Sequence, residues 1–119
     1  MSAGNHKFVT IITCMDGRVQ APGSNWMKQA FKADFVDTIT EPGPEAKIES
    51  VKDRVLISVN AHHSDTVAIA AHHDCAGNPV SAEKHAEMVK ECVKIVESWK
   101  LPVKVLGLWI NEKWEVERL

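Results

Sequence analysis

Short apolar runs alternate with longer amphipathic segments along this chain. Residues 8–13 and 66–71 are almost wholly apolar and rich in β-branched or small side chains, which is typical of strands covered on both faces. Residues 35–40 alternate between polar and apolar side chains, as an edge strand does, and residues 103–110 form a further apolar run. After a short turn, residues 114–117 alternate again, which predicts an antiparallel edge strand.

Helices are predicted between these runs. A Pro-Gly pair favours a turn at 20–23, and Ser24 or Asn25 can cap a short helix at 26–32. Apolar residues recur at helical spacing over about 45–60, which predicts a second helix. Strands that alternate with helices indicate a three-layer α/β fold with a mainly parallel sheet, although periodicity leaves the strand order open.

The longest predicted helix covers about 82–99 and follows Ser81, a suitable N-cap residue. Its apolar side chains form two adjacent stripes, one of Ala82, Ala86, Val89, Val93 and Val96, the other of Met88, Cys92, Ile95 and Trp99. One face of a sheet rarely requires so wide an apolar surface. We therefore expect a partner subunit, in a homodimer or higher homo-oligomer, to cover the remainder.

Length and charge restrict the class of protein. A chain of 119 residues fits a single domain, 1–119, and the net charge of −2 provides no basic surface for nucleic acid or an anionic membrane. No apolar run approaches the roughly 20 residues that span a bilayer, and the polar start at 1–7 does not resemble a signal peptide. An odd number of cysteines without a secretion signal favours a cytoplasmic protein with metal-binding or free thiols.

Two motifs follow the two most apolar runs. Cys14-Met15-Asp16-Gly17-Arg18 comes after residues 8–13, and His72-His73-Asp74-Cys75 comes after residues 66–71. If both runs are strands of one parallel sheet, both motifs leave it at the same carboxyl edge, where open α/β sheets build their sites. Two thiols and one imidazole are a donor set suited to Zn²⁺, with a fourth position for water or a carboxylate.

These residues resemble the β-class carbonic anhydrases, whose zinc signature is Cys-x-Asp-x-Arg after the first strand and His-x-x-Cys after the third. Cys14, Asp16 and Arg18 match the first pattern, and His72 and Cys75 match the second. The resemblance implies the strand order 2-1-3-4 with an antiparallel fifth strand at the edge. It also implies Zn²⁺ as the cofactor.

The same resemblance implies a lyase that reversibly hydrates CO₂ to bicarbonate by a zinc-bound hydroxide, or that hydrolyses a related small molecule such as COS or CS₂. Cys14, His72 and Cys75 would hold the metal. Asp16, restrained by Arg18, would accept a hydrogen bond from the hydroxide. Asp16 released from Arg18 would instead become the fourth ligand and close the site, and the sequence leaves these two states open.

The chain also departs from the family pattern. The Arg-Asn-Ala-Gly type of loop after the second strand is replaced here by Thr-Glu-Pro-Gly-Pro at 40–44, and the two glycines beside the second motif are Ala71 and Ala76. A non-catalytic zinc-binding module with a closed or rebuilt site is therefore the alternative. A redox-sensing thiol protein using Cys14 and Cys75 is a third hypothesis, against which the absence of Cys-x-x-Cys counts.

The remaining candidate residues receive structural roles. His73 and Asp74 are expected at the surface, and His62 and His63 in a solvated loop, with a proton shuttle as the alternative. Cys92 is expected to be a buried small hydrophobe. The tryptophans are expected in core or dimer contacts, and they are Trp26, Trp99, Trp109 and Trp114.

Overall fold

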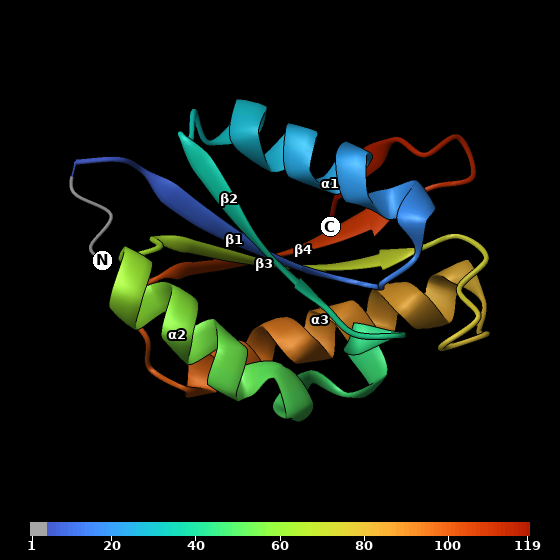
Figure 1. Cartoon of the computed structure of the whole chain (residues 1–119). Coiled ribbons are helices and arrows are strands. Elements are labelled where there is room, and N and C mark those ends of the chain that lie inside the picture. Colours follow the sequence, from blue (N-terminus) through green and yellow to red (C-terminus); the bar gives the residue numbers. More distant parts are fainter. Residues whose placement is uncertain (1–4) are drawn as a thin grey trace.

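A five-stranded sheet forms the centre of the molecule (Figure 1). The computed structural model describes residues 5–119, so part of the polar start at 1–7 lies outside it. The strand order is β2-β1-β3-β4-β5, with β5 antiparallel to β4 and the other pairs parallel. The strands are β1 (Phe8–Thr13), β2 (Phe35–Thr40), β3 (Thr66–His72), β4 (Lys104–Ile110) and β5 (Val116–Arg118). This topology confirms the expected α/β fold and strand order.

Helices cover both faces of the sheet, which gives three layers (Figure 1). Helix α1 (Gly17–Ala30) lies on one face, whereas α2 (Lys52–His62) and α3 (Ala82–Ser98) lie on the other. Alternating side chains of the central strands supply the two cores. Ile11 and Ala68 face α1, while Ile12 and Ile69 face α2 and α3. Strand β3 is buried along its whole length, as its apolar sequence predicts.

Helix α1 corrects the expected turn at 20–23 and the expected short helix at 26–32. Its N-cap is Asp16, whose Oδ1 accepts a hydrogen bond from the Arg18 backbone N–H at 2.9 Å, not Ser24 or Asn25. The Pro-Gly pair lies inside this helix. A Cβ at the buried Gly23 would lie 3.0 Å from Ile11 Cδ1, so this glycine permits close packing of the helix on β1.

The prediction of one continuous helix at 45–60 is also wrong. Two 3₁₀ turns, η1 (Pro44–Ala46) and η2 (Ile48–Val51), precede α2 and are separated by Lys47, whose φ of −143° is not helical. The apolar spacing nevertheless reports burial correctly, because Ile48, Val51 and Val55 all enter the core. Glu45, in η1, is buried although its side chain is a carboxylate.

The turn between β4 and β5 is longer than expected, and β5 begins at Val116 instead of Trp114. The Asn111 side-chain oxygen accepts hydrogen bonds from the backbone N–H groups of Lys113 and Glu115, at 2.9 and 3.0 Å. Trp114 adopts a left-handed backbone conformation, with φ of 61°, at the end of this turn. Its indole therefore lies in a loop at the carboxyl edge of the parallel strands.

The second apolar stripe of α3 is partly covered within the chain. Met88, Cys92 and Ile95 line a pocket of about 430 Å³ against residues 45–50.

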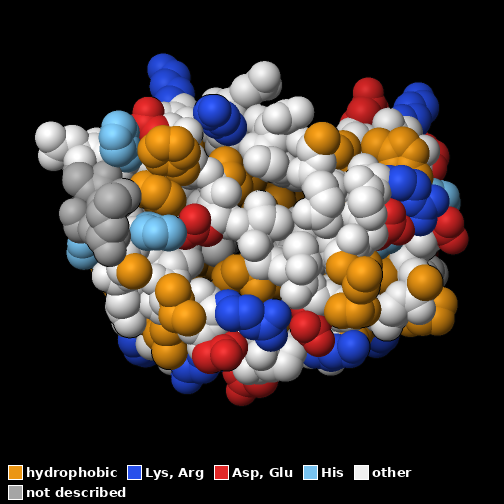
Figure 2. Space-filling view, in the orientation of Figure 1, with side chains coloured by type: hydrophobic (Ala, Val, Ile, Leu, Met, Phe, Trp, Pro, Cys, Tyr) orange, Lys and Arg blue, Asp and Glu red, His pale blue; other side chains and the backbone are white. Residues whose placement is uncertain are grey.

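On the molecular face drawn in Figure 2, positive and negative side chains lie next to one another along the edges. Within residues 5–119, no helix has both the length and the apolar composition needed to cross a membrane.

Replacement of Pro22 by alanine tests whether residues 20–23 are helical. Proline inside a helix costs about 3 kcal/mol relative to alanine, and the gain in unfolded-chain entropy offsets about 1 kcal/mol. We expect Pro22→Ala to raise the free energy of unfolding by about 1–2 kcal/mol, measured by denaturant titration. Pro102→Ala, in an exposed bend, is the control and should give no increase. A Pro22→Ala protein no more stable than the wild type would contradict the helical assignment.

Candidate metal centre

Two loops at the carboxyl edge of the sheet bring Cys14, His72 and Cys75 together. Cys14 directly follows β1, and His72 is the last residue of the neighbouring strand β3. The potential ligand atoms of the three side chains all lie within 4.8 Å of one another. All three residues are buried, with exposed fractions of 5, 1 and 4%. No other group of this kind occurs among residues 5–119.

The imidazole of His72 is arranged as a metal ligand would be. Its Nδ1 lies 2.7 Å from the backbone carbonyl oxygen of His73, a partner that requires the proton to be on Nδ1. The buried Nε2 then carries a lone pair, and it has no hydrogen-bond partner among the residues that the structure describes. Buried polar atoms are normally paired, so this nitrogen fits a metal ion that completes its coordination. The soft and borderline donor set fits Zn²⁺.

The thiol of Cys75 is protonated more readily than a free cysteine. Burial raises its pKa most, and the neighbouring Cys14 raises it further, whereas the backbone N–H groups of Asn78 and Gly77 donate to the sulfur and lower it. A metal ion that binds here must displace the proton from this thiol. Metal affinity is therefore expected to rise with pH.

Asp16 and Arg18 form an ion pair beside the three-residue cluster. The Arg18 guanidinium donates hydrogen bonds to both carboxylate oxygens of Asp16, with Nε 3.0 Å from Oδ1 and Nη2 2.7 Å from Oδ2. These hydrogen bonds lower the pKa of Asp16 to about 2, and the backbone N–H of Arg18 contributes to the shift. Asp16 is not a member of the cluster of ligand atoms within 4.8 Å. It is therefore an ionised acceptor that Arg18 holds in one orientation.

Two further residues hold Arg18, and neither was predicted from the sequence to belong to the site. Asp74 Oδ2 lies 3.2 Å from Arg18 Nη1, although Asp74 is exposed as expected. The Trp114 ring lies 4.5 Å from the guanidinium carbon and interacts with its charge through the aromatic face. Trp114 packs against the core on the α1 side as expected, whereas its contact with Arg18 was not predicted. Trp114 follows β4, the neighbour of β3, and β3 ends at the second motif. This position in the sequence was the signal that could have placed Trp114 near the site.

His62, His63 and Cys92 are not members of the cluster. His62 is half-buried, stacks on Phe8 at the start of β1 and pairs with Asp37 at 2.7 Å, so it lies at the opposite end of that strand from Cys14. The expectation of a merely solvated His62 is therefore wrong, whereas His63 is exposed. Cys92 is buried in the core as expected, and burial, with Glu45 and Glu91 nearby, raises its pKa to about 12.

The pKa of Asp16 tests the ion pair directly. In metal-free wild-type protein, NMR titration of the carboxyl carbon should give a pKa of about 2. In Arg18→Ala the value should rise toward about 4, the ordinary aspartate value. Because the folded-state pKa is lowered, the stabilisation is present above the ordinary value and is lost as the pH falls through the folded-state value. Arg54→Ala, which removes an arginine that pairs with Glu41, is the control. An ordinary Asp16 pKa in the wild type would contradict the ion pair.

Comparisons with known proteins agree with this fold. The carbonic anhydrase from Glaciozyma antarctica aligns with a TM-score of 0.59 and 17% identity, over 92% of this chain and 80% of that one. The β-carbonic anhydrase CafA of the fungal pathogen Aspergillus fumigatus aligns with a TM-score of 0.61 and 14% identity, over 98% and 76%. No curated protein sequence gives a significant match. A family model described as "Putative carbonic anhydrase" matches residues 4–119, and the chain therefore belongs to that carbonic anhydrase family.

Proposed function

We propose that this protein is a zinc-dependent lyase that reversibly hydrates CO₂ to bicarbonate. The observation that carries the proposal is the buried cluster of Cys14, His72 and Cys75, in which His72 Nε2 has no other partner among residues 5–119. Three protein ligands with a fourth position open is the pattern of catalytic zinc sites, whereas structural sites use four protein ligands. Membership of the carbonic anhydrase family supports the same assignment.

The three ligands would balance the charge of the metal. Two thiolates and a neutral imidazole formally neutralise Zn²⁺, so a buried centre would carry no net charge. A Zn²⁺ ion bound here would supply a nucleophile near neutral pH by lowering the pKa of water. The hydrogen bond from His72 Nδ1 to the His73 carbonyl would keep Nε2 directed at the metal.

Asp16 would orient the reacting water through a hydrogen bond. Its pKa of about 2 keeps the carboxylate ionised at neutral pH, so it can only accept a hydrogen bond. Arg18 engages both carboxylate oxygens, and this competes with any role of Asp16 as a fourth ligand. This geometry favours a site open to water over a site closed by Asp16.

Location and assembly are part of the proposal. Three free cysteines, two of them in the cluster, suit a reducing cytoplasm. A homodimer is proposed because the 3₁₀ turns η1 and η2 leave part of the apolar face of α3 uncovered. Light scattering of the purified protein tests this oligomeric state. The substrate would be CO₂ or bicarbonate. COS and CS₂ are alternative substrates because they present the same kind of linear molecule with an electrophilic carbon.

Zinc content tests the ligand assignment. Wild-type protein should contain about one zinc ion per chain, and Cys75→Ser should lose the metal together with part of its folding stability. Cys92→Ser is the matched control, because Cys92 is a buried thiol outside the cluster and should leave the zinc content unchanged. Full zinc occupancy in Cys75→Ser would refute this residue as a ligand.

Stopped-flow CO₂ hydration tests catalysis. The zinc-loaded wild type should turn over CO₂, whereas Arg18→Ala should keep its zinc and lose about 10²-fold or more in kcat, since Asp16 would no longer be held. The same assay with COS and CS₂ distinguishes the substrates. Zinc-loaded wild type without turnover on any of the three would favour the non-catalytic module. Undiminished activity in Arg18→Ala would refute the role given to the ion pair.

A further inference from the structure

A buried pair of titratable side chains lies near the cluster, and the proposed mechanism does not use it. The side chains of Glu45, in η1, and His85, in α3, are only 1 and 2% exposed. Glu45 Oε2 lies 2.5 Å from His85 Nδ1. A buried pair of this kind contributes little net stability, because an apolar pair of similar volume often does as well. Its distinctive effect is to fix geometry around the carboxylate.

The same carboxylate oxygen connects the pair to the second ligand loop. Asn78 Nδ2 donates a hydrogen bond to Glu45 Oε2 at 3.0 Å, and Asn78 is only 9% exposed. Asn78 lies three residues after Cys75, in the loop that follows β3. The side chain of Asn78 therefore ties Glu45 to the loop that carries Cys75.

A close backbone contact reinforces this link. Gly43, which precedes η1, has a φ of +55° and lies so near Gly77 that a Cβ on it would be 2.8 Å from the Gly77 carbonyl carbon. A Cβ on Gly77 would in turn lie 2.7 Å from the Gly43 nitrogen. The loop that carries Glu45 and the loop that carries Cys75 are thus packed backbone against backbone.

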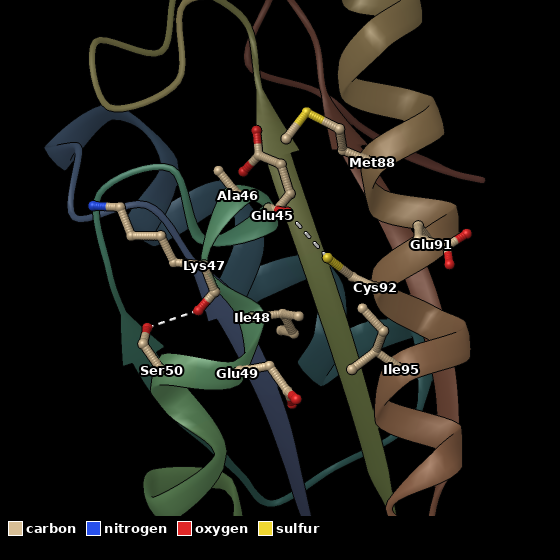
Figure 3. A pocket seen from close by; sticks show the side chains of 10 residues that line it. All are labelled: Glu45, Ala46, Lys47, Ile48, Glu49, Ser50, Met88, Glu91, Cys92 and Ile95. Carbon is tan, nitrogen blue, oxygen red and sulfur yellow. Dashed lines mark hydrogen bonds between the residues drawn. The ribbon is translucent and has the colours of Figure 1, made fainter.

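The Glu45 side chain is oriented so that one carboxylate oxygen receives the hydrogen bonds from His85 and Asn78. In Figure 3 its carboxylate is directed toward Met88, while its backbone carbonyl accepts a hydrogen bond from Cys92 Sγ at 3.2 Å. Asn78 Nδ2 also lies 3.4 Å from Met88 Sδ. The other carboxylate oxygen, Oε1, has no hydrogen-bond partner among residues 5–119. All hydrogen bonds to this buried carboxylate therefore converge on the one oxygen that holds Asn78.

We propose that Glu45, His85 and Asn78 form a positioning network that sets the Cys75 sulfur for metal binding. His85 anchors the Glu45 carboxylate, and Glu45 anchors the Asn78 side chain. Asn78 and the packing of Gly77 on Gly43 then hold the loop that places the Cys75 sulfur, and the network includes none of the three proposed ligands. This inference rests on the proposed zinc site.

Two variants at Asn78 test the network by zinc affinity and by the spectrum of the cobalt-substituted protein. Asn78→Ala removes the donor to Glu45, and Asn78→Asp places a second carboxylate in the same volume. We expect zinc affinity, measured by competition with a chelator, to fall by about 10–100-fold in both variants. The thiolate-to-cobalt charge-transfer band should shift or weaken, which a change in overall stability alone would not cause.

Ser58→Ala is the matched control. Ser58 is also buried, and its hydroxyl bonds Thr10 and Asp37 at 2.6 and 2.7 Å, in a network that includes none of the three ligands. This variant should lose stability and keep wild-type zinc affinity. The positioning role would be overturned if both Asn78 variants kept wild-type zinc affinity and an unchanged cobalt band. It would also be overturned if Ser58→Ala lost as much zinc affinity as the Asn78 variants. Either result would leave the proposed zinc site standing. Failure of the wild type to bind zinc would overturn the proposed function and this inference with it.

Discussion

Parallel pairing of β1 with β3 is the constraint on which the candidate metal centre depends. Thr10 to Ile12 pair in register with Val67 to Ile69, so the two neighbouring strands end at the same edge of the sheet. After these strands the chain turns to opposite faces, to α1 in one case and toward α3 in the other (Figure 1). Open α/β sheets build their sites where adjacent strands diverge in this way. Cys14, His72 and Cys75 lie at this edge, with their potential ligand atoms within 4.8 Å of one another.

Two sets of contacts then surround the buried cluster from different sides. On the exposed side, Arg18 joins Asp16 to Asp74 under the ring of Trp114, which fixes an ionised carboxylate beside the cluster. On the buried side, Glu45 receives hydrogen bonds from α3 and from the loop after Cys75. In the proposed function, the exposed set would orient the reacting molecule and the buried set would position a ligand.

Strong periodicity made the central strands predictable, and local packing made the rest difficult. The apolar runs at 8–13 and 66–71 predicted β1 and β3 almost to the residue, because burial on both faces requires such runs. The resemblance to the β-class carbonic anhydrases gave the strand order. Pro22-Gly23 suggested a turn, whereas Gly23 serves a helix–sheet contact that only the fold reveals. Trp114 and the Glu45 network were missed because both reach the site through contacts between residues distant in sequence.

X-ray absorption at the zinc edge, on wild-type protein purified without added chelator, is the most direct test of the account. It reports the type, number and distance of the atoms bound to the metal. We expect two sulfur atoms at about 2.3 Å and two nitrogen or oxygen atoms at about 2.0–2.1 Å, from the two cysteines, His72 and a water molecule. A spectrum without sulfur, or one with four sulfur atoms, would contradict a centre built from Cys14, His72 and Cys75.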